Sequence, residues 1–486
     1  MAKWEFAVEL ERKADVPIFL QIARAIVRDI RRGRLRPGDA LPGARTLALS
    51  LGVQRGTVVA AYDELVAEGW TVHRAARGAF VSRALPEQKP RRSGRERSGL
   101  PERFVIDCAP APSGELPYSV PPGALFFSPN RPDVRLIPRD LIGRAYRRAV
   151  RSGSGVLFGY GRPQGHERLR AAVAEMLSST RALAAGADDV VITRGSQMAI
   201  ALLARAIVAP GDVVAVEELS HRPAAEVFRL QGAKVVTIPL DRDGVRVEPL
   251  ERLARAGGLR ALHVTPHHQF PTTVTLSASR RLRLLELARR HRFAILEEDS
   301  DHEFHYDGRP VLPLASSDRD GIVAYVGTFS KVLAPALRIG FVVAPRPLLE
   351  RLAAHRLHFD VQGDRVLEHA LAELIERGDV QRHVRRVRRE YAARREVLVS
   401  ALRRHLGDAL ACEMPAGGIG LWARVADGLD IEAWAARASE RGAVIATARS
   451  FAVDRRPRPF ARLGFAALDR AELEEGVRQL AAARRG

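Results

Sequence analysis

The 486-residue sequence predicts an α/β protein with two folded units: a winged helix-turn-helix unit at residues 1–83 and a larger unit at residues 104–486 built on a mostly parallel sheet. Three observations carry this prediction. The segment between the units, residues 84–103, is mostly Pro, Gly, Ser and charged residues, a composition typical of a linker. Before it, three helical patterns precede two short strands. After it, apolar strand-like runs alternate with helix-length segments.

The first unit begins with a helix in which apolar residues recur every four positions. Pro17 precedes this helix and Gly33 ends it. RTLALSLGV predicts a short second helix that ends at Gly52, and QRGTVVAAYDELVAEGW predicts a third that ends at Gly69. WTVHRAARGAFVS predicts two short strands around a basic tip. The isoleucines that define the face of the first helix are Ile18, Ile22, Ile26 and Ile30.

The start of the third helix carries residues suited to DNA. A helix-turn-helix places these residues, here Gln54, Arg55, Gly56 and Thr57, in the major groove. Arg and Gln can form bidentate hydrogen bonds with base edges, whereas Thr and a helix N-terminus suit phosphates. The chain has 77 Lys and Arg against 57 Asp and Glu, a net charge of +20, which favours an anionic partner. Arginine is abundant everywhere in the chain, so the charge alone is weak evidence for DNA.

From PIFLQ at residue 17 to AEGW at residue 70, the sequence resembles the GntR-type winged-helix domain, most specifically in RLRPGDALPGARTLA. The resemblance implies that Arg45 and Arg55, at the starts of the second and third helices, contact operator DNA. It gives related roles to Thr57 and to the wing glycine, Gly78. The family often has a serine pair where this chain has GA at residues 43–44, so a phosphate contact from those hydroxyls is not expected.

The larger unit contains seven apolar, β-rich runs, most of them separated by helix-length segments such as QMAIALLARAIVA. Near-continuous apolar strands that alternate with helices predict a parallel-type sheet covered on both faces. The runs are DVVIT (189–193), VVAVEE (213–218), KVVTIPL (234–240), LRALHVT (259–265), RFAILEED (292–299), GIVAYVG (321–327) and RIGFVVAP (338–345).

Polar residues follow three of these runs, and ligands of such sheets bind at the carboxyl ends of strands. Ser196 and Gln197 open a helix whose N–H groups suit a phosphate. An acidic cluster, residues 297–299, ends the fifth run, and Lys331 lies in the small-residue loop GTFSK, with Arg338 seven residues later. A phosphate site, an acid, a lysine and a second cation are the parts needed to hold pyridoxal phosphate. Neither a Walker A pattern nor GxGxxG is present, so a nucleotide is not indicated.

GYGRPQGHERLRAAVAEML, VTPHHQFPTTVTLSASRRLRLLELARRH and YVGTFSKVLAPALRIGFVVAP resemble fold-type I aminotransferases. Over essentially the whole chain, the order of the two units resembles the MocR/GabR class, which fuses a GntR-type winged helix to that fold. The resemblance implies a smaller C-terminal subdomain, a head-to-tail homodimer and a transcriptional regulator that binds pyridoxal phosphate or an amine or amino-acid effector. It makes Lys331 the covalent attachment point and Arg462 a ligand for an effector carboxylate. Phosphate-binding positions fall on Ser196, Gln197, Thr328, Ser330 and Arg338.

Three departures from the family pattern fall on the expected cofactor pocket. The aspartate that pairs with the pyridine nitrogen is replaced by Glu298, with Asp299 as the alternative. Ser300 stands where the family has a tyrosine that reaches the ring hydroxyl, and His221 stands where a tyrosine stacks on the ring. These changes argue against efficient turnover, although residual transamination stays open. Two alternatives are a working aminotransferase that carries a DNA-binding domain and a regulator whose pocket has lost the cofactor.

Other features narrow the class of protein. The two cysteines are far apart and predict neither a disulfide framework nor a cysteine metal site. HH at 267–268 and HEFH at 302–305 are weak metal signals because neither lies in a clear helix, and no metal site is predicted. No signal peptide and no membrane-spanning stretch are expected, which predicts a cytoplasmic protein.

Overall fold

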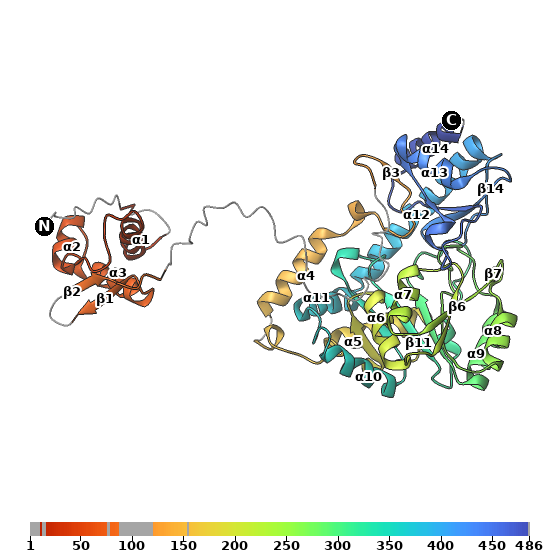
Figure 1. The fold of residues 1–486 in the computed structure, drawn as a ribbon, viewed down its shortest axis with the longest axis horizontal. Helices are drawn as coiled ribbons and strands as arrows, with labels where there is room; N and C mark the ends of the chain where they lie inside the picture. The colour runs from red at the N-terminus through yellow and green to blue at the C-terminus, as the bar shows by residue number, and fades with distance from the viewer. Residues whose placement is uncertain (1–9, 12–15, 75–77, 87–119, 153–154, 485–486) are drawn as a thin grey trace. The chain divides into compact units, whose positions relative to one another are not determined.

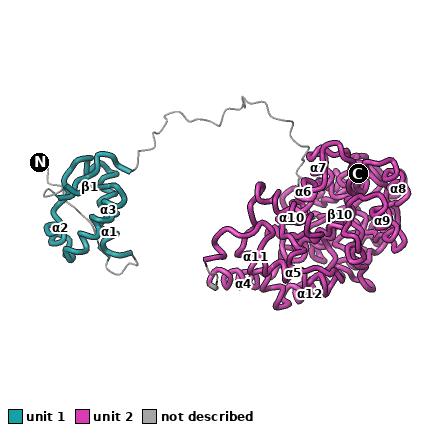
Figure 2. The backbone as a smooth tube through the Cα atoms, turned by 90° about the horizontal axis from the view of Figure 1, so that it is seen from below, with its two compact units in different colours: residues 1–108 teal, residues 109–486 magenta. Residues whose placement is uncertain are grey.

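The computed structural model describes residues 10–11, 16–74, 78–86, 120–152 and 155–484. The chain divides into two compact units, Met1–Cys108 and Ala109–Gly486 (Figure 2). From residue 87 onward, the predicted linker lies outside the described residues, as does the expected tip of the wing at residues 75–77. Among the helices that the structure describes, none has the length and apolar character required to cross a bilayer.

The first unit contains the predicted three helices and two-stranded wing (Figure 1). Gly52 ends the second helix with a φ of 63°, a left-handed conformation that glycine adopts without steric cost. The Tyr62 hydroxyl donates to the carbonyl of Pro42 at 2.7 Å and so ties the third helix to the chain before the second. The predicted isoleucine face is buried except at Ile18, which is partly buried. The elements are α1 (Ile18–Arg31), α2 (Ala44–Leu51), α3 (Arg55–Ala67), β1 (Thr71–Arg74) and β2 (Gly78–Val81).

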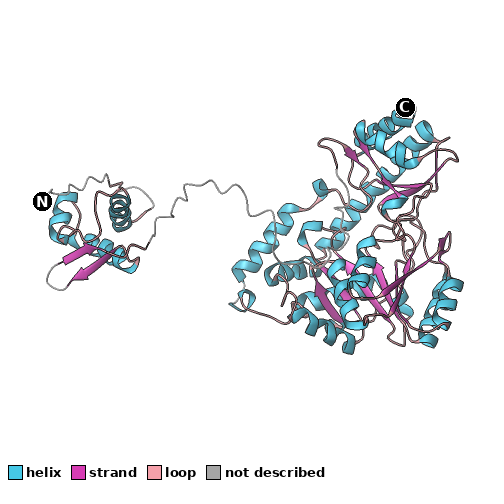
Figure 3. Ribbon diagram, in the orientation of Figure 1, coloured by secondary structure: helices cyan, strands magenta, loops and turns pink. Residues whose placement is uncertain are grey.

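The second unit is built on a seven-stranded sheet in the order β4-β12-β11-β10-β9-β5-β6. Figure 3 shows strands of this unit with helices around them. All seven predicted runs form its strands. Their bounds are β4 (Val190–Thr193), β5 (Val213–Glu217), β6 (Lys234–Ile238), β9 (Leu259–Val264), β10 (Ala294–Asp299), β11 (Val323–Thr328) and β12 (Gly340–Val343).

One strand departs from parallel order: β12 is antiparallel to both β11 and β4, whereas the pairs of β11, β10, β9, β5 and β6 are parallel. The chain between β11 and β12, residues 329–339, contains a single 3₁₀ turn, Pro335–Leu337, and no crossover helix. A connection of that length reverses the chain direction, because a parallel return needs a crossover of a dozen or more residues. The loop that carries Lys331 is therefore a reversal at the carboxyl end of β11.

Helices bury both faces of the sheet. On one face, α6, α7 and α10 pack against Val191, Val216, Leu296 and Val326. On the other face, α5 and α11 cover one half, and α8 and α9 cover the other. The helix bounds are α5 (Glu167–Arg181), α6 (Ser196–Ile207), α7 (Arg222–Leu230), α8 (Val247–Arg255), α9 (Ala278–His291), α10 (Arg346–Leu357) and α11 (Arg365–Glu376).

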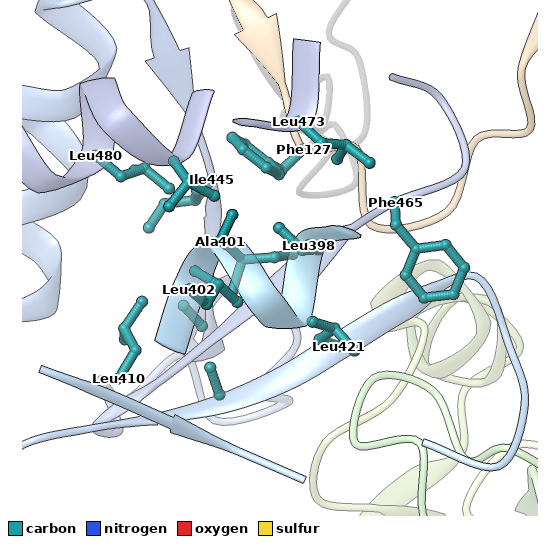
Figure 4. Packing of buried hydrophobic residues seen from close by; sticks show 14 of the residues in the cluster. Phe127, Leu398, Ala401, Leu402, Leu410, Leu421, Ile445, Phe465, Leu473 and Leu480 are labelled. Atoms are coloured by element: carbon teal, nitrogen blue, oxygen red, sulfur yellow. The ribbon is translucent and has the colours of Figure 1, made fainter. Parts of the chain in front are cut away.

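The C-terminal part of this unit forms a smaller subdomain around its own core, which contains Phe127, Leu402, Leu421 and Phe465 (Figure 4). Its four-stranded sheet has the order β13-β14-β17-β16. β15 pairs with β3, so the subdomain also includes a segment from the start of the unit. The remaining elements are β3 (Leu125–Phe126), α4 (Arg139–Ser152), β7 (Leu240–Asp241), β8 (Gly244–Val245), α12 (Asp379–Leu406), β13 (Leu410–Cys412), β14 (Gly420–Val425), α13 (Ile431–Glu440), β15 (Ala443–Val444), β16 (Ala446–Thr447), β17 (Phe460–Gly464) and α14 (Arg470–Arg484).

Candidate functional site

A cavity of about 570 Å³ brings together the predicted residues that follow β4, β10 and β11. This volume is within the range of small-molecule sites. Two predicted residues, Asp299 and Arg462, are not in its lining. The predicted residues that line it are Ser196, Gln197, His221, Glu298, Thr328, Ser330, Lys331 and Arg338.

Lys331 lies in this cavity because the loop after β11 turns back into β12. Its amine donates a hydrogen bond to the carbonyl of Asn130. Desolvation lowers the pKa of the Lys331 amine to about 8, and the nearby carboxylates of Asp301 and Glu298 offset this only in part. A substantial fraction of the amine is therefore neutral near physiological pH, the form that is nucleophilic.

One end of the cavity is suited to a phosphate. Gly195 precedes α6 with a φ of 78°, and a Cβ placed on it would lie 2.7 Å from Arg338 Nη2. Arg338 is held there by a hydrogen bond from Nη2 to the carbonyl of Arg194, 2.9 Å long. The Thr328 hydroxyl lies 3.0 Å from Ser330 Oγ and accepts from the Ser330 N–H at 3.1 Å. A helix N-terminus, two hydroxyls and a guanidinium thus surround one position.

Glu298 supplies a negative charge to the same cavity. Its Oε2 lies 3.2 Å from Nε2 of His263, which is buried on the neighbouring strand β9. Burial alone would raise the pKa of the Glu298 carboxyl, but the hydrogen bond and charge of His263 lower it to about 2. Glu298 is therefore ionised at neutral pH and can pair with a cationic ring nitrogen.

Asp299, the alternative acid, lies on the opposite face of the sheet because successive residues of a strand point to opposite sides. Its Oδ2 accepts from the Tyr325 hydroxyl at 2.7 Å and lies 3.1 Å from His302 Nδ1. The same oxygen is 3.7 Å from the Arg181 guanidinium. Burial opposes ionisation of Asp299, but the charges of His302 and Arg181 outweigh it and hold the pKa of Asp299 far below the usual range. The expectation that Asp299 could replace Glu298 in the pocket is therefore corrected.

The two residues that stand in place of family tyrosines both line the cavity. Ser300 Oγ lies 3.3 Å from Glu298 Oε1 and donates to it, so the hydroxyl is directed back along the strand. The His221 ring stands edge-on to Phe270, with ring centroids 6.3 Å apart. Burial lowers the pKa of His221, which favours a neutral ring able to stack on a cofactor.

Arg462, on β17, lies behind the cavity wall and is 1% exposed. Its Nε donates to the carbonyl of Pro129 at 2.9 Å, and its guanidinium lies 4.8 Å from the centre of the Phe270 ring. Pro129 and Phe270 both line the cavity. Contact with an effector carboxylate would thus require movement of this wall.

Several lining residues were not predicted from the sequence. Asn130 and Arg131 come from the start of the unit, Arg222 from the first turn of α7, and Asp301 from the loop after β10. Arg222 follows His221 directly and could have been found from that position. Asn130 could not, because its contact with Lys331 spans two hundred residues of sequence and depends on the docking of the C-terminal subdomain.

Four of the predicted DNA-binding residues lie at the start of α3, whereas Arg45 lies at the start of α2 and Gly78 begins β2. Gln54 is the residue before α3, and Arg55 is its first residue. Arg45, Gln54, Arg55 and Gly56 are exposed, and Thr57 is partly buried. Gly78 begins β2 with a φ of 91°, a conformation that disfavours any side chain.

Comparisons with known proteins agree with this two-part architecture. Residues 19–81 match the family "Bacterial regulatory proteins, gntR family", and residues 138–480 match "Aminotransferase class I and II". The probable rhizopine catabolism regulatory protein MocR of Rhizobium meliloti is 34% identical over 98% of this chain and 95% of its own length. The pyridoxine biosynthesis transcriptional regulator PdxR of Corynebacterium glutamicum is 31% identical over 80% of this chain and 82% of its own length.

Among solved structures, LysN, an α-aminoadipate aminotransferase from Thermus thermophilus complexed with N-(5'-phosphopyridoxyl)-L-leucine, superposes with a TM-score of 0.70. It is 29% identical and covers 75% of this chain and 93% of its own. The similarity to MocR extends through both units, whereas the extent of the similarity to LysN corresponds to the larger unit alone. The chain therefore belongs to the MocR/GabR class of transcriptional regulators, in which a GntR-type winged helix is fused to an aminotransferase class I and II domain.

Proposed function

We propose that this chain regulates transcription by binding operator DNA through its winged helix, and that its larger unit binds pyridoxal 5'-phosphate and senses it or an amine or amino-acid effector. The observation that carries the proposal is the cavity in which Lys331, the N-terminus of α6 and Glu298 meet. In a chain that has both this cavity and a DNA-binding unit, the occupancy of the cavity can control binding to DNA.

The residues of the cavity fit the phosphate of the cofactor. Ser196, Thr328, Ser330 and Arg338 line the part of the cavity beside Gly195, whose φ of 78° favours glycine. The Gln197 side-chain amide donates to the carbonyl of Pro223 at 3.0 Å and would have to turn away from it to donate to the phosphate. Phosphate dianions bind well to hydroxyls, guanidinium groups and helix N-termini. We assign these residues to the phosphate.

The rest of the cavity fits the ring, with fewer contacts than the family pattern offers. Bound pyridoxal phosphate supplies an aldehyde that bonds to an amine and a ring that withdraws electrons. Glu298 would hold a proton on the ring nitrogen, and Lys331 would supply the amine. The Ser300 side chain is shorter than the tyrosine of the family and does not reach the ring hydroxyl. His221 offers a smaller stacking surface than tyrosine. Weak anchoring of the ring favours a sensor over an enzyme with efficient turnover.

A dimer is part of the proposal. An exposed apolar segment contains Val156, Phe158 and Tyr160, whose exposed fractions are 65%, 62% and 88%. Arg365 donates to the carbonyls of Gly159 and Tyr160 at 3.0 and 3.2 Å, which fixes this segment beside α11. A contiguous exposed apolar segment held in a defined shape suits a protein interface. We propose that it packs against a second copy of the chain in a head-to-tail dimer, which acts on DNA in the cytoplasm.

An absorbance spectrum tests the cofactor assignment. Addition of pyridoxal phosphate to the wild-type chain should produce a visible band that differs from that of the free cofactor. Lys331→Ala should abolish the band. Lys234→Ala is the matched control, because Lys234 is exposed on β6 and is the other lysine in the described part of the chain. Loss of the band in neither variant, or no band at saturating cofactor, would mean that the pocket serves another ligand.

A further inference from the structure

Three histidines meet beside the Lys331 cavity, and the proposed function gives none of them a role. His267 and His268 lie in the loop after β9, and His305 lies in the loop after β10. One ring nitrogen from each lies within 4.8 Å of those of the other two. The sequence pairs HH and HEFH lie in different loops, and neither lies in a helix. The fold brings members of both pairs together.

The geometry of the group is close to that of a metal centre. His268 Nε2 and His305 Nδ1 are 3.2 Å apart, and their rings are stacked at 5.4 Å with an interplanar angle of 7°. Two nitrogens bound to one tetrahedral Zn²⁺ at about 2.0–2.1 Å would lie roughly 3.4 Å apart. The centroid of the His267 ring is 3.8 Å from that of His268. The three donor nitrogens lie within 4.8 Å of one another and would have to come closer to reach one ion.

The His267 ring forms no hydrogen bond with the described residues. It is 4% exposed, and both of its ring nitrogens lack a hydrogen-bond partner among the described residues. A buried imidazole without any partner is costly, about 1–3 kcal/mol for each unsatisfied group. Neutral imidazole binds metals through a ring lone pair, and the His267 nitrogens have no hydrogen-bond partner among the described residues that would compete for it.

The surroundings hold the ligands in place. Asp301 Oδ1 lies 3.3 Å from Nδ1 of His268, the carboxylate partner that metal-binding histidines usually have on their second nitrogen. A Cβ on Gly417 would lie 2.0 Å from His268 Nε2, so only glycine permits the ring to occupy this position. The backbone of His305 pairs with the same Gly417. The loop of the C-terminal subdomain thus closes over the histidines.

We propose that His267, His268 and His305 bind a divalent first-row transition metal ion, with Zn²⁺ the best match to three neutral imidazoles. Mg²⁺ and Ca²⁺ prefer oxygen ligands and do not suit this donor set. His267 and His268 also line the cavity of Lys331, so the ion would lie in the cavity wall with access to small molecules. The ion would be a ligand of the regulator in addition to the cofactor.

The test uses the tag-free full-length chain, stripped with a chelator and prepared without pyridoxal phosphate. Wild-type protein should bind one equivalent of Zn²⁺ in equilibrium dialysis. With Co²⁺ as the probe, it should show the intense visible absorption of a tetrahedral site. His305→Gln and His267→Asn should each weaken binding by at least about tenfold, and Asp301→Asn by about tenfold. His358→Gln is the control, because His358 is exposed at the end of α10 and should leave both signals unchanged.

Thermal melts without metal show whether each variant is folded, and folded variants that keep wild-type Zn²⁺ affinity would overturn the proposal. A wild-type Co²⁺ spectrum of weak, octahedral type would also overturn it, and would leave the 3.2 Å contact between His268 and His305 as a hydrogen bond between two rings. The cofactor assignment does not depend on either result, because Lys331 and Glu298 are tested by the absorbance of pyridoxal phosphate.

Discussion

At the scale of residues, the alternation of side chains along β10 decides which acid serves the cavity. Glu298 and Ser300 face the lysine, whereas Glu297 and Asp299 face the other side of the sheet. Glu297 accepts from the N–H groups of Leu314 and Ala315, at 2.7 and 2.9 Å, and so anchors a 3₁₀ turn. Of the three acids in the cluster, Glu298 therefore lines the cavity, whereas Glu297 and Asp299 form structural hydrogen bonds on the other side of the sheet.

Ser300→Tyr should tighten cofactor binding. A phenol at this position could hydrogen-bond to the ring oxygen, and one hydrogen bond to a charged group is worth about 1.5–3 kcal/mol, roughly ten- to a hundredfold in affinity. Titration of pyridoxal phosphate by absorbance measures the change. Ser300→Phe is the matched control because it adds the same bulk without the hydroxyl. Equal affinities for the two variants would show that the missing phenol is not what weakens the site.

The reactivity of Lys331 should depend on pH in a defined direction. The pKa of its amine is lowered from 10.5 to about 8, so the nucleophilic neutral form is present above pH 8 and is lost as pH falls below it. The rate of covalent attachment of pyridoxal phosphate should rise about tenfold per pH unit up to about pH 8 and then level off. Stopped-flow absorbance gives this profile. A rise that continues to about pH 10, the ordinary range of a lysine amine, would mean a solvated lysine.

At the scale of elements, all seven strands of the large sheet were predicted because each is an apolar run with turn residues on both sides. The direction of β12 could not be predicted in this way, since direction depends on the connection and not on the strand's own residues. The histidine group was also missed. His268 and His305 are separated by more than thirty residues, and only the parallel pairing of β9 with β10 places their loops at one edge.

Helix α3 should account for sequence recognition by the winged unit. Arg55→Ala should weaken binding by about 1–3 kcal/mol if the guanidinium contacts a base. The probe is a duplex selected by the wild-type protein from a random pool, and fluorescence anisotropy measures affinity. Arg24→Ala is the control, because Arg24 is an exposed arginine on α1 and its loss changes the net charge equally. Unchanged affinity when Arg45 and Arg55 are both replaced would refute this role for α3.

At the scale of the whole molecule, two winged helices can bind one operator together only if two copies of the chain are held together. A winged helix contacts one half-site, and a dimer contacts two, so the affinity for a paired site depends on the dimer. The exposed apolar segment at residues 155–160 is on the larger unit, the part that also contains the cofactor cavity. An interface there would connect the occupant of the cavity with the pairing of the winged helices.

Substitution of this segment should separate dimer formation from folding. Phe158→Asp places a charge at the proposed interface and should weaken dimer formation by about 2 kcal/mol or more, which raises the dimer dissociation constant roughly thirtyfold. Leu282→Asp is the matched control, because Leu282 is 70% exposed on α9, away from this segment. Sedimentation velocity at micromolar concentration measures the mass, and anisotropy compares duplexes with one and two half-sites. Phe158→Asp should lose the preference for the paired duplex and keep the affinity for a single half-site, since α3 is untouched. A wild-type chain that is monomeric with and without pyridoxal phosphate would contradict the dimer, and a dimeric Phe158→Asp variant would place the interface on another surface.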